Sequence, residues 1–207
     1  MRTCITTCCL IVLLAGCTPR PTAADQAAIR QRLDRFNQAW RAGDAAAARD
    51  AIELTSPEAN EFFTSQVDLL AARQRVQKAV DSVWSQTPWK VFPSPGVRDL
   101  VPADLDSYAK RTAEADDKML LNPEGTVQVL DSSKHELFLM RKDDRGSWKI
   151  DPSTFGDVDQ KTKWARDDIT FADEMAAAIA SGSTQRFQQV MHHQIAVLAR
   201  RAIENPP

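Results

Sequence analysis

Residues 127–150 decide the fold class and read VQVLDSSKHELFLMRKDDRGSWKI. Apolar residues alternate within 127–130, 137–140 and 148–150, which is the period of β-strands that bury one face. The intervening segments 131–134 and 143–146 are short and rich in turn-forming residues, so the three strands are predicted to form an antiparallel meander. The middle strand is apolar on both faces. We therefore expect helices on one side of it and a pocket or a partner on the other.

Three helices are predicted before this sheet. The first runs from about residue 24 to 42, with apolar residues at helical spacing (Ile29, Leu33, Phe36 and Trp40). Gly43 is suited to end it, and Asp44 to cap a second, alanine-rich helix that extends to about residue 54. Ser56 and Pro57 open a third helix, as cap and first helical residue, and this helix is predicted to reach Trp84.

The segment 85–125 contains five of the eleven prolines, so its regular structure is predicted to be short: an edge strand at 89–92 and a helix at 103–115. After the sheet, two more amphipathic helices are predicted on either side of Gly182. Their apolar stripes are Trp164, Phe171, Met175 and Ile179, and then Phe187, Val190, Met191, Ile195 and Leu198. We expect them to form a helical hairpin that packs on the domain or on a neighbour.

The stretch Phe36-Asn37-Gln38-Ala39-Trp40-Arg41-Ala42-Gly43-Asp44, followed by an alanine-rich helix, resembles the opening of NTF2-like proteins. The segment 137–151 is similar to the last two strands of that superfamily. The resemblance covers residues 25–155 and implies a cone, in which a curved antiparallel sheet wraps around helices and encloses an apolar cavity. The expected fold is therefore α+β, with helices packed on a curved antiparallel sheet and a C-terminal helical hairpin at 156–207. An α+β domain of no named type is the alternative.

The first residues carry a targeting signal. Arg2 precedes an apolar run at 8–14, which is shorter than the roughly 20 residues that a membrane-spanning helix needs and suits a signal peptide. Leu14-Ala15-Gly16-Cys17 resembles the lipobox of bacterial lipoproteins. This resemblance implies removal of residues 1–16, a diacylglycerol on the Cys17 sulfur and an acyl group such as palmitate on its amino group. Thr18 after the cysteine implies the outer membrane, facing the periplasm, in a bacterium with two membranes.

Residues 17–24 then form the lipidated cysteine and a proline-containing tether. An ordinary secretory signal peptide or an uncleaved anchor is the alternative interpretation of the same segment. Several acyl chains hold a protein stably at a bilayer, whereas one chain binds marginally.

The composition excludes several classes of protein. The chain has 207 residues, of which 43% are hydrophobic and 26% charged, so it can form one domain with its own core and is not disordered, collagenous or a multi-pass membrane protein. A net charge of −2 offers no basic surface for nucleic acid. All four cysteines lie within the first 17 residues, so no internal disulfide is expected after processing.

Three residues are candidates for binding a ligand or a partner. Trp84 and Trp89 flank a proline-containing loop, where they could stack on an apolar ligand or insert at a protein interface; packing within the core or the loop is the alternative. Tyr108 lies near Asp104 and Asp106. A Tyr/Asp pair could polarise a carbonyl and take a proton. The resemblance to NTF2-like proteins implies this possibility, because that superfamily includes hydratases and isomerases. A solvated acidic loop is the alternative.

No catalytic residue, metal ligand set or cofactor is predicted. His192 and His193 are adjacent on a helix and point about 100° apart, so they do not converge on one metal ion. His135 is expected to be exposed at the start of a strand. The sequence contains no phosphate-binding or dinucleotide-binding glycine motif and no nucleophile motif.

The sequence thus favours a membrane-anchored lipoprotein of the cell envelope that is non-catalytic and binds a partner protein or a small apolar ligand. One alternative is a hydratase or isomerase of the NTF2-like kind, with Tyr108 and an aspartate or His135 in one closed cavity. Another is a structural envelope protein that self-associates through its C-terminal hairpin.

Overall fold

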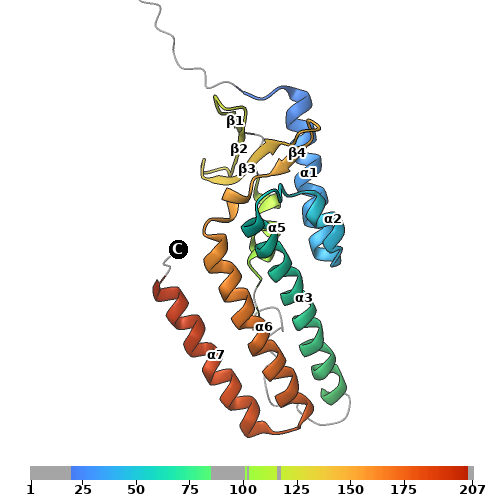
Figure 1. Cartoon of the computed structure of the whole chain (residues 1–207), viewed down its shortest axis with the longest axis vertical. Coiled ribbons are helices and arrows are strands. Elements are labelled where there is room, and N and C mark those ends of the chain that lie inside the picture. The colour runs from blue at the N-terminus through green and yellow to red at the C-terminus, as the bar shows by residue number, and fades with distance from the viewer. Residues whose placement is uncertain (1–19, 85–100, 102, 116–117, 205–207) are drawn as a thin grey trace, which may run out of the picture.

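The structure is a computed structural model that describes residues 20–84, 101, 103–115 and 118–204. Within these ranges the chain forms six α-helices and a four-stranded antiparallel sheet, so the α+β class is confirmed. Figure 1 shows the sheet and the first helix at one end of the molecule, while three long helices extend toward the other end. None of the helices in the described ranges is both long and apolar enough to cross a membrane.

The first helix ends and the second helix begins at the residues that the sequence indicates. Helix α1 (Ala23–Ala42) is capped by Thr22, whose side chain accepts a hydrogen bond from the backbone of Asp25, and it ends at Gly43, which has a φ of 73°. Such a positive φ suits glycine, because other residues pay a steric cost there. Helix α2 (Ala45–Asp50) is capped by the side chain of Asp44.

The prediction that this second helix reaches residue 54 is wrong. The chain leaves the helix after Asp50 because it adds to the edge of the sheet. Ile52 forms a parallel bridge with Ile150. The Ile150 N–H donates to the carbonyl of Ala51 at 2.8 Å, and the Glu53 N–H donates to the carbonyl of Ile150 at 2.9 Å.

The sheet is a meander in the order β1-β2-β3-β4, with all neighbours antiparallel. Its strands are β1 (Met119–Leu121), β2 (Val127–Leu130), β3 (Glu136–Lys142) and β4 (Trp148–Ile150). The last three were predicted. Strand β1 was not, because it is three residues long and lies in the proline-rich segment. On β3, side chains of both faces are buried or half-buried, as its apolar pattern indicates.

Two long helices run side by side in the same direction: α3 (Pro57–Trp84) and α6 (Val158–Ala180) (Figure 1). The hydroxyl of Ser56 caps α3 by accepting from the Ala59 N–H at 3.1 Å, as predicted. The two helices pack against each other. Both bury small side chains, which are Ala72 on α3 and Ala165 and Ala172 on α6. The larger side chains of Leu69 and Met175 are buried as well.

Shorter elements connect these parts. Helix α5 (Asp104–Arg111) continues into the 3-10 turn η1 (Thr112–Glu114), which matches the helix predicted at 103–115. The 3-10 turn η2 (Pro152–Phe155) joins β4 to α6. After Gly182, helix α7 (Thr184–Glu204) runs back along α6. The strand predicted at 89–92 lies outside the described residues.

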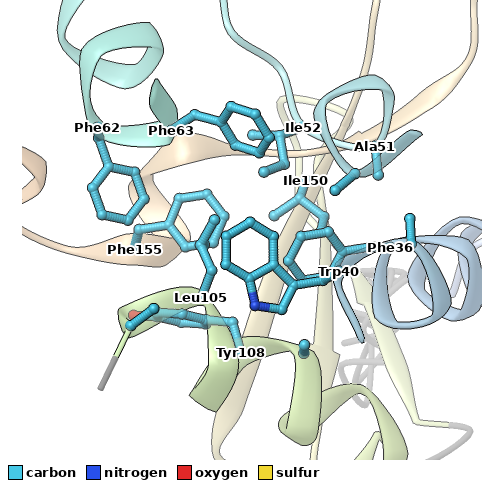
Figure 2. Close-up of a cluster of buried hydrophobic side chains, with 14 of the residues drawn as sticks. Phe36, Trp40, Ala51, Ile52, Phe62, Phe63, Leu105, Tyr108, Ile150 and Phe155 are labelled. Carbon is cyan, nitrogen blue, oxygen red and sulfur yellow. The ribbon is translucent and has the colours of Figure 1, made fainter. Parts of the chain in front are cut away.

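Aromatic rings fill the junction between the helices and the sheet (Figure 2). Phe36 stacks on Trp40 with centroids 6.5 Å apart, and Phe62 meets Phe155 at 5.4 Å. Trp40, on the predicted apolar stripe of α1, and Trp148, on β4, are core residues with exposed fractions of 3% and 5%. Trp164, on the predicted apolar stripe of α6, is only half-buried.

Candidate functional site

Of the four residues that the sequence singles out for binding or modification, the structure places one side chain. Cys17 and Trp89 lie outside the described residues, and Trp84 is the last residue of α3, with a side chain that also lies outside them. Tyr108, on α5, is buried, with 7% of its surface exposed.

Tyr108 has an aromatic side and a charged side. Its ring meets Phe155 edge-on at 4.9 Å and Phe138 at 6.5 Å. Its hydroxyl accepts a hydrogen bond from Lys161 Nζ at 3.2 Å, and the same ammonium lies 5.1 Å from the ring centroid. The guanidinium of Arg111 lies 5.2 Å from that centroid. Figure 2 shows the oxygen at the end of the ring that points away from Trp40.

The two aspartates near Tyr108 face different surroundings. Asp106 Oδ1 accepts from the Trp40 indole at 2.9 Å, and its Oδ2 lies 2.6 Å from the Arg73 guanidinium. These contacts join α5 to α1 and α3. Asp104 lies one turn before Tyr108 and therefore shares its helix face. Burial raises the pKa of Asp104, and so does the charge of Asp168, while Lys161 and Arg201 act in the opposite direction.

The acid–base constellation considered from sequence is not brought together. His135 lies in the turn before β3, with a side chain that is 80% exposed and 3.4 Å from Asp131. Asp106 is held by Trp40 and Arg73. Only Asp104 shares a face with Tyr108. Among the residues that the structure describes, no group of three or more His, Cys, Asp or Glu side chains is arranged to hold a metal ion.

A second polar cluster, which sequence reasoning missed, joins α6 to α7. Asp168 is 3% exposed, and its two carboxylate oxygens lie 2.9 and 2.8 Å from the same nitrogen of Arg201. Gln194 donates to Asp168 at 3.1 Å. The Arg201 guanidinium also lies 5.5 Å from the centroid of the Trp164 ring. A charged residue within the apolar stripe of the helix was the available signal, because Asp168 follows Trp164 by one turn and precedes Phe171.

Helix α7 is covered less than the other long helices. Among its described side chains only Gln194 is fully buried, and the apolar ones that face α6 are half-buried. Ile195 and Ile203 are 57% and 81% exposed. A contiguous exposed apolar patch marks a place where a partner binds, whereas a single exposed aliphatic side chain is ordinary on a protein surface.

An open hollow runs along the outer face of α1, and the residues that contribute to it include Ala27, Arg30, Gln31, Asp34 and Arg35. Charged and amide groups share this surface with alanines. Its chemistry does not favour a purely apolar ligand.

Comparison of this chain with models of protein families, with curated proteins and with solved structures gives no match.

Proposed function

We propose that this protein is a lipoprotein of the bacterial cell envelope, anchored through Cys17, that acts without catalysis by binding a partner protein through the outer side of α7. The NTF2-like character of the domain is part of the same proposal. It is supported by the resemblance of residues 25–155 to that superfamily and is consistent with helices packed beside an antiparallel meander.

The contacts at the start of α1 agree with a short tether. Pro21 is buried, and its carbonyl accepts from the side chain of Gln26 at 3.0 Å. Pro21 lies four positions after Cys17, which corresponds to at most about 14 Å of extended chain. A lipid on Cys17 would therefore hold the folded part close to the bilayer. The beginning of α1 and the turn between α6 and α7 lie at opposite ends of the molecule (Figure 1).

The exposure of Ile195 and Ile203 is the observation that carries the partner-binding proposal. Helix α7 contributes no fully buried apolar side chain among its described residues, and it keeps these two isoleucines at the surface. A partner protein that covers α7 would bury this apolar surface. Each Å² of apolar area that is removed from water contributes about 25 cal/mol to the free energy of binding.

Binding of a small apolar ligand and catalysis receive less support. The junction that would enclose an apolar ligand is filled by rings such as Phe36, Phe62 and Phe155. Asp106 is one half of a possible acid–base pair with Tyr108, but its carboxylate accepts a hydrogen bond from Trp40 and forms an ion pair with Arg73. We therefore favour a protein partner over both.

Lipid attachment is tested by growing cells with labelled palmitate. We expect the wild-type protein to carry the label and to sediment with membranes, and Cys17→Ser to lose both properties. Cys9→Ser is the matched control, because it removes a cysteine from the segment that is cut off, and it should keep the label. Equal labelling of Cys17→Ser and the wild type would contradict the anchor.

Partner binding is tested by a photo-crosslinking residue placed at 195 in the full-length protein in membranes. The control position is 31, which is exposed on α1. We expect a discrete adduct with another protein at 195 and none at 31, and we expect Ile203→Gln to weaken that adduct. An adduct with a second copy of this chain would instead support the self-associating alternative, and no adduct at 195 would contradict the proposal.

A further inference from the structure

The surroundings of Tyr108 differ from three places in the described part of the chain where a buried or half-buried cation meets a carboxylate. Arg73 lies 2.6 Å from Asp106, Arg201 lies 2.8 Å from Asp168, and the half-buried Lys149 lies 2.9 Å from Asp50. These pairs compensate the cost of removing a charge from water. Among the residues that the structure describes, neither the half-buried Lys161 nor the exposed Arg111 beside Tyr108 lies in such a pair.

Lys161 and Arg111 approach Tyr108 from different elements. Lys161 Nζ, on α6, lies 3.2 Å from the hydroxyl, and the Arg111 Cζ, on α5, lies 5.2 Å from the ring centroid. Within the described part of the chain, neither side chain forms an ion pair with a carboxylate. Two positive groups therefore lie at one phenol, and no carboxylate of the described residues forms an ion pair with either of them.

The hydrogen-bonding capacity of this group of residues is matched to an oxyanion. The phenol oxygen accepts from Lys161, which leaves its own O–H to donate. The ammonium has further protons, and the guanidinium presents several donors in one plane. Charge-assisted hydrogen bonds of this kind are stronger than neutral ones.

We propose that Tyr108, Lys161 and Arg111 form a binding site for a small oxyanion, a carboxylate or a phosphate group, where α5 meets α6. The phenol O–H and the two cations donate to the anion. This site is separate from the surface of α7 that is proposed for a partner protein.

Asp104 gives the site a pH dependence. The charged groups that face Asp104 are Lys161 and Asp168 from α6 and Arg201 from α7, and burial is the largest cause of its raised pKa. A carboxyl with a raised pKa takes up its proton at a higher pH than an ordinary aspartate. Its negative charge then no longer competes for Lys161, so the affinity for an anion increases as the pH falls.

The test measures binding to the full-length protein in detergent by isothermal titration calorimetry. Sulfate is the first probe, because its charge stays constant over the pH range of interest. Inorganic phosphate and acetate then distinguish a tetrahedral anion from a carboxylate. We expect saturable binding of at least one of these anions at pH 7 and tighter binding of sulfate at pH 5.

The variants separate a site from a general effect of charge. Lys161→Met is expected to weaken binding about tenfold, the loss of one charge-assisted hydrogen bond. Lys110→Met is the matched control: it removes the same charge from an exposed position on α5 and should leave the affinity unchanged. Tyr108→Phe keeps the ring and removes only the hydroxyl, so it provides a second test if Lys161→Met fails to fold.

Three results would overturn the proposal. They are no saturable binding of any of the three anions, an equal loss of affinity in Lys161→Met and Lys110→Met, and an unchanged affinity in Tyr108→Phe. None of these depends on whether Cys17 carries a lipid or α7 binds a partner.

Discussion

Asp25, in the first turn of α1, connects three segments through a single carboxylate. Its Oδ2 accepts from the Thr22 hydroxyl at 2.7 Å, while its Oδ1 accepts from the Trp148 indole at 3.0 Å and lies 2.9 Å from Lys142 Nζ. The hydrogen bond from Thr22, followed by those from Lys142 and Trp148, lowers the pKa of Asp25 from 3.8 to about 2. The start of α1 is thereby joined to β3 and β4.

A lowered pKa in the folded state means that the ionised form stabilises the fold. This contribution is complete above pH 3.8 and is lost as the pH falls toward about 2. We expect Asp25→Asn to lower the free energy of unfolding by about 1 kcal/mol at pH 7, after allowing for screening by solvent, and to flatten its decline in that acid range. Urea titrations at several pH values measure both effects. Asp34→Asn, exposed on the same helix, is the control, and equal changes in both variants would refute the prediction.

Two arginines on α3 allow a buried ion pair to be compared with an exposed one. The side chains of Arg73 and Asp106 are 9% and 19% exposed, whereas those of Arg75 and Asp173 are 48% and 51% exposed. Arg73→Met removes the cation that lies 2.6 Å from the Asp106 carboxylate at the junction of α1, α3 and α5, and it should cost about 3 kcal/mol. Arg75→Met should cost less than about 0.5 kcal/mol. Chemical denaturation measures both, and similar losses would contradict this assignment.

At the scale of elements, local signals explain what could be predicted from the sequence. Asp44 and Ser56 act within three residues of the backbone groups that they cap, and Gly43 needs only its own conformation. The errors concern contacts with distant parts of the chain. Residues 51–53 leave the second helix because a strand almost 100 residues later pairs with them, and β1 exists because β2 is beside it.

In the candidate site, too, local features could be predicted from the sequence and contacts between distant residues could not. Tyr108 could be selected from the sequence, because it is the one tyrosine of the chain and lies beside aspartates. Its contact with Lys161 spans 53 residues, and Arg201 is 33 residues from Asp168. Neither spacing has a local signature, so both partners became visible only in the folded chain.

Helix α7 is attached to α6 by one buried ion pair and by half-buried apolar side chains, and we expect loss of one partner of the ion pair to loosen it. Asp168 is 3% exposed, and α7 buries no apolar side chain completely among its described residues. Arg201→Met should therefore increase the rate of amide hydrogen exchange in α7 about 100-fold, the effect of losing about 3 kcal/mol. Exchange in α6 should change much less.

Arg186→Met, which removes an exposed charge from the first turn of α7, is the control and should leave the exchange rates as they are. In the double variant Asp168→Leu with Arg201→Met, no charge is left without a partner, and protection should recover in part. If α7 exchanged at the wild-type rate in Arg201→Met, its apolar stripe would be the main attachment instead.

At the scale of the whole molecule, one continuous core reaches from the sheet through α1, α3, α5 and α6. Helix α7 adds only half-buried residues to it, such as Phe187, Val190 and Met191. A chain that ends at Ser183 should therefore keep its tertiary structure and melt at a lower temperature. Near-ultraviolet circular dichroism measures whether tertiary structure is kept, because the buried Trp40 and Trp148 contribute to the signal. Loss of that signal would show that α7 is needed for folding.

The bridge between Ile52 and Ile150 has a consequence for many copies crowded on one surface. Strand β4 would otherwise present free backbone groups along its outer margin, and such margins recruit strands from other molecules into aggregates. Residues 51–53 occupy them with two hydrogen bonds. The opposite margin, β1, is only three residues long and offers little length for pairing. With the proposed lipid anchor on Cys17, neighbouring copies in the plane of a bilayer would be kept from pairing through their sheets, and contacts between them would be left to their helices.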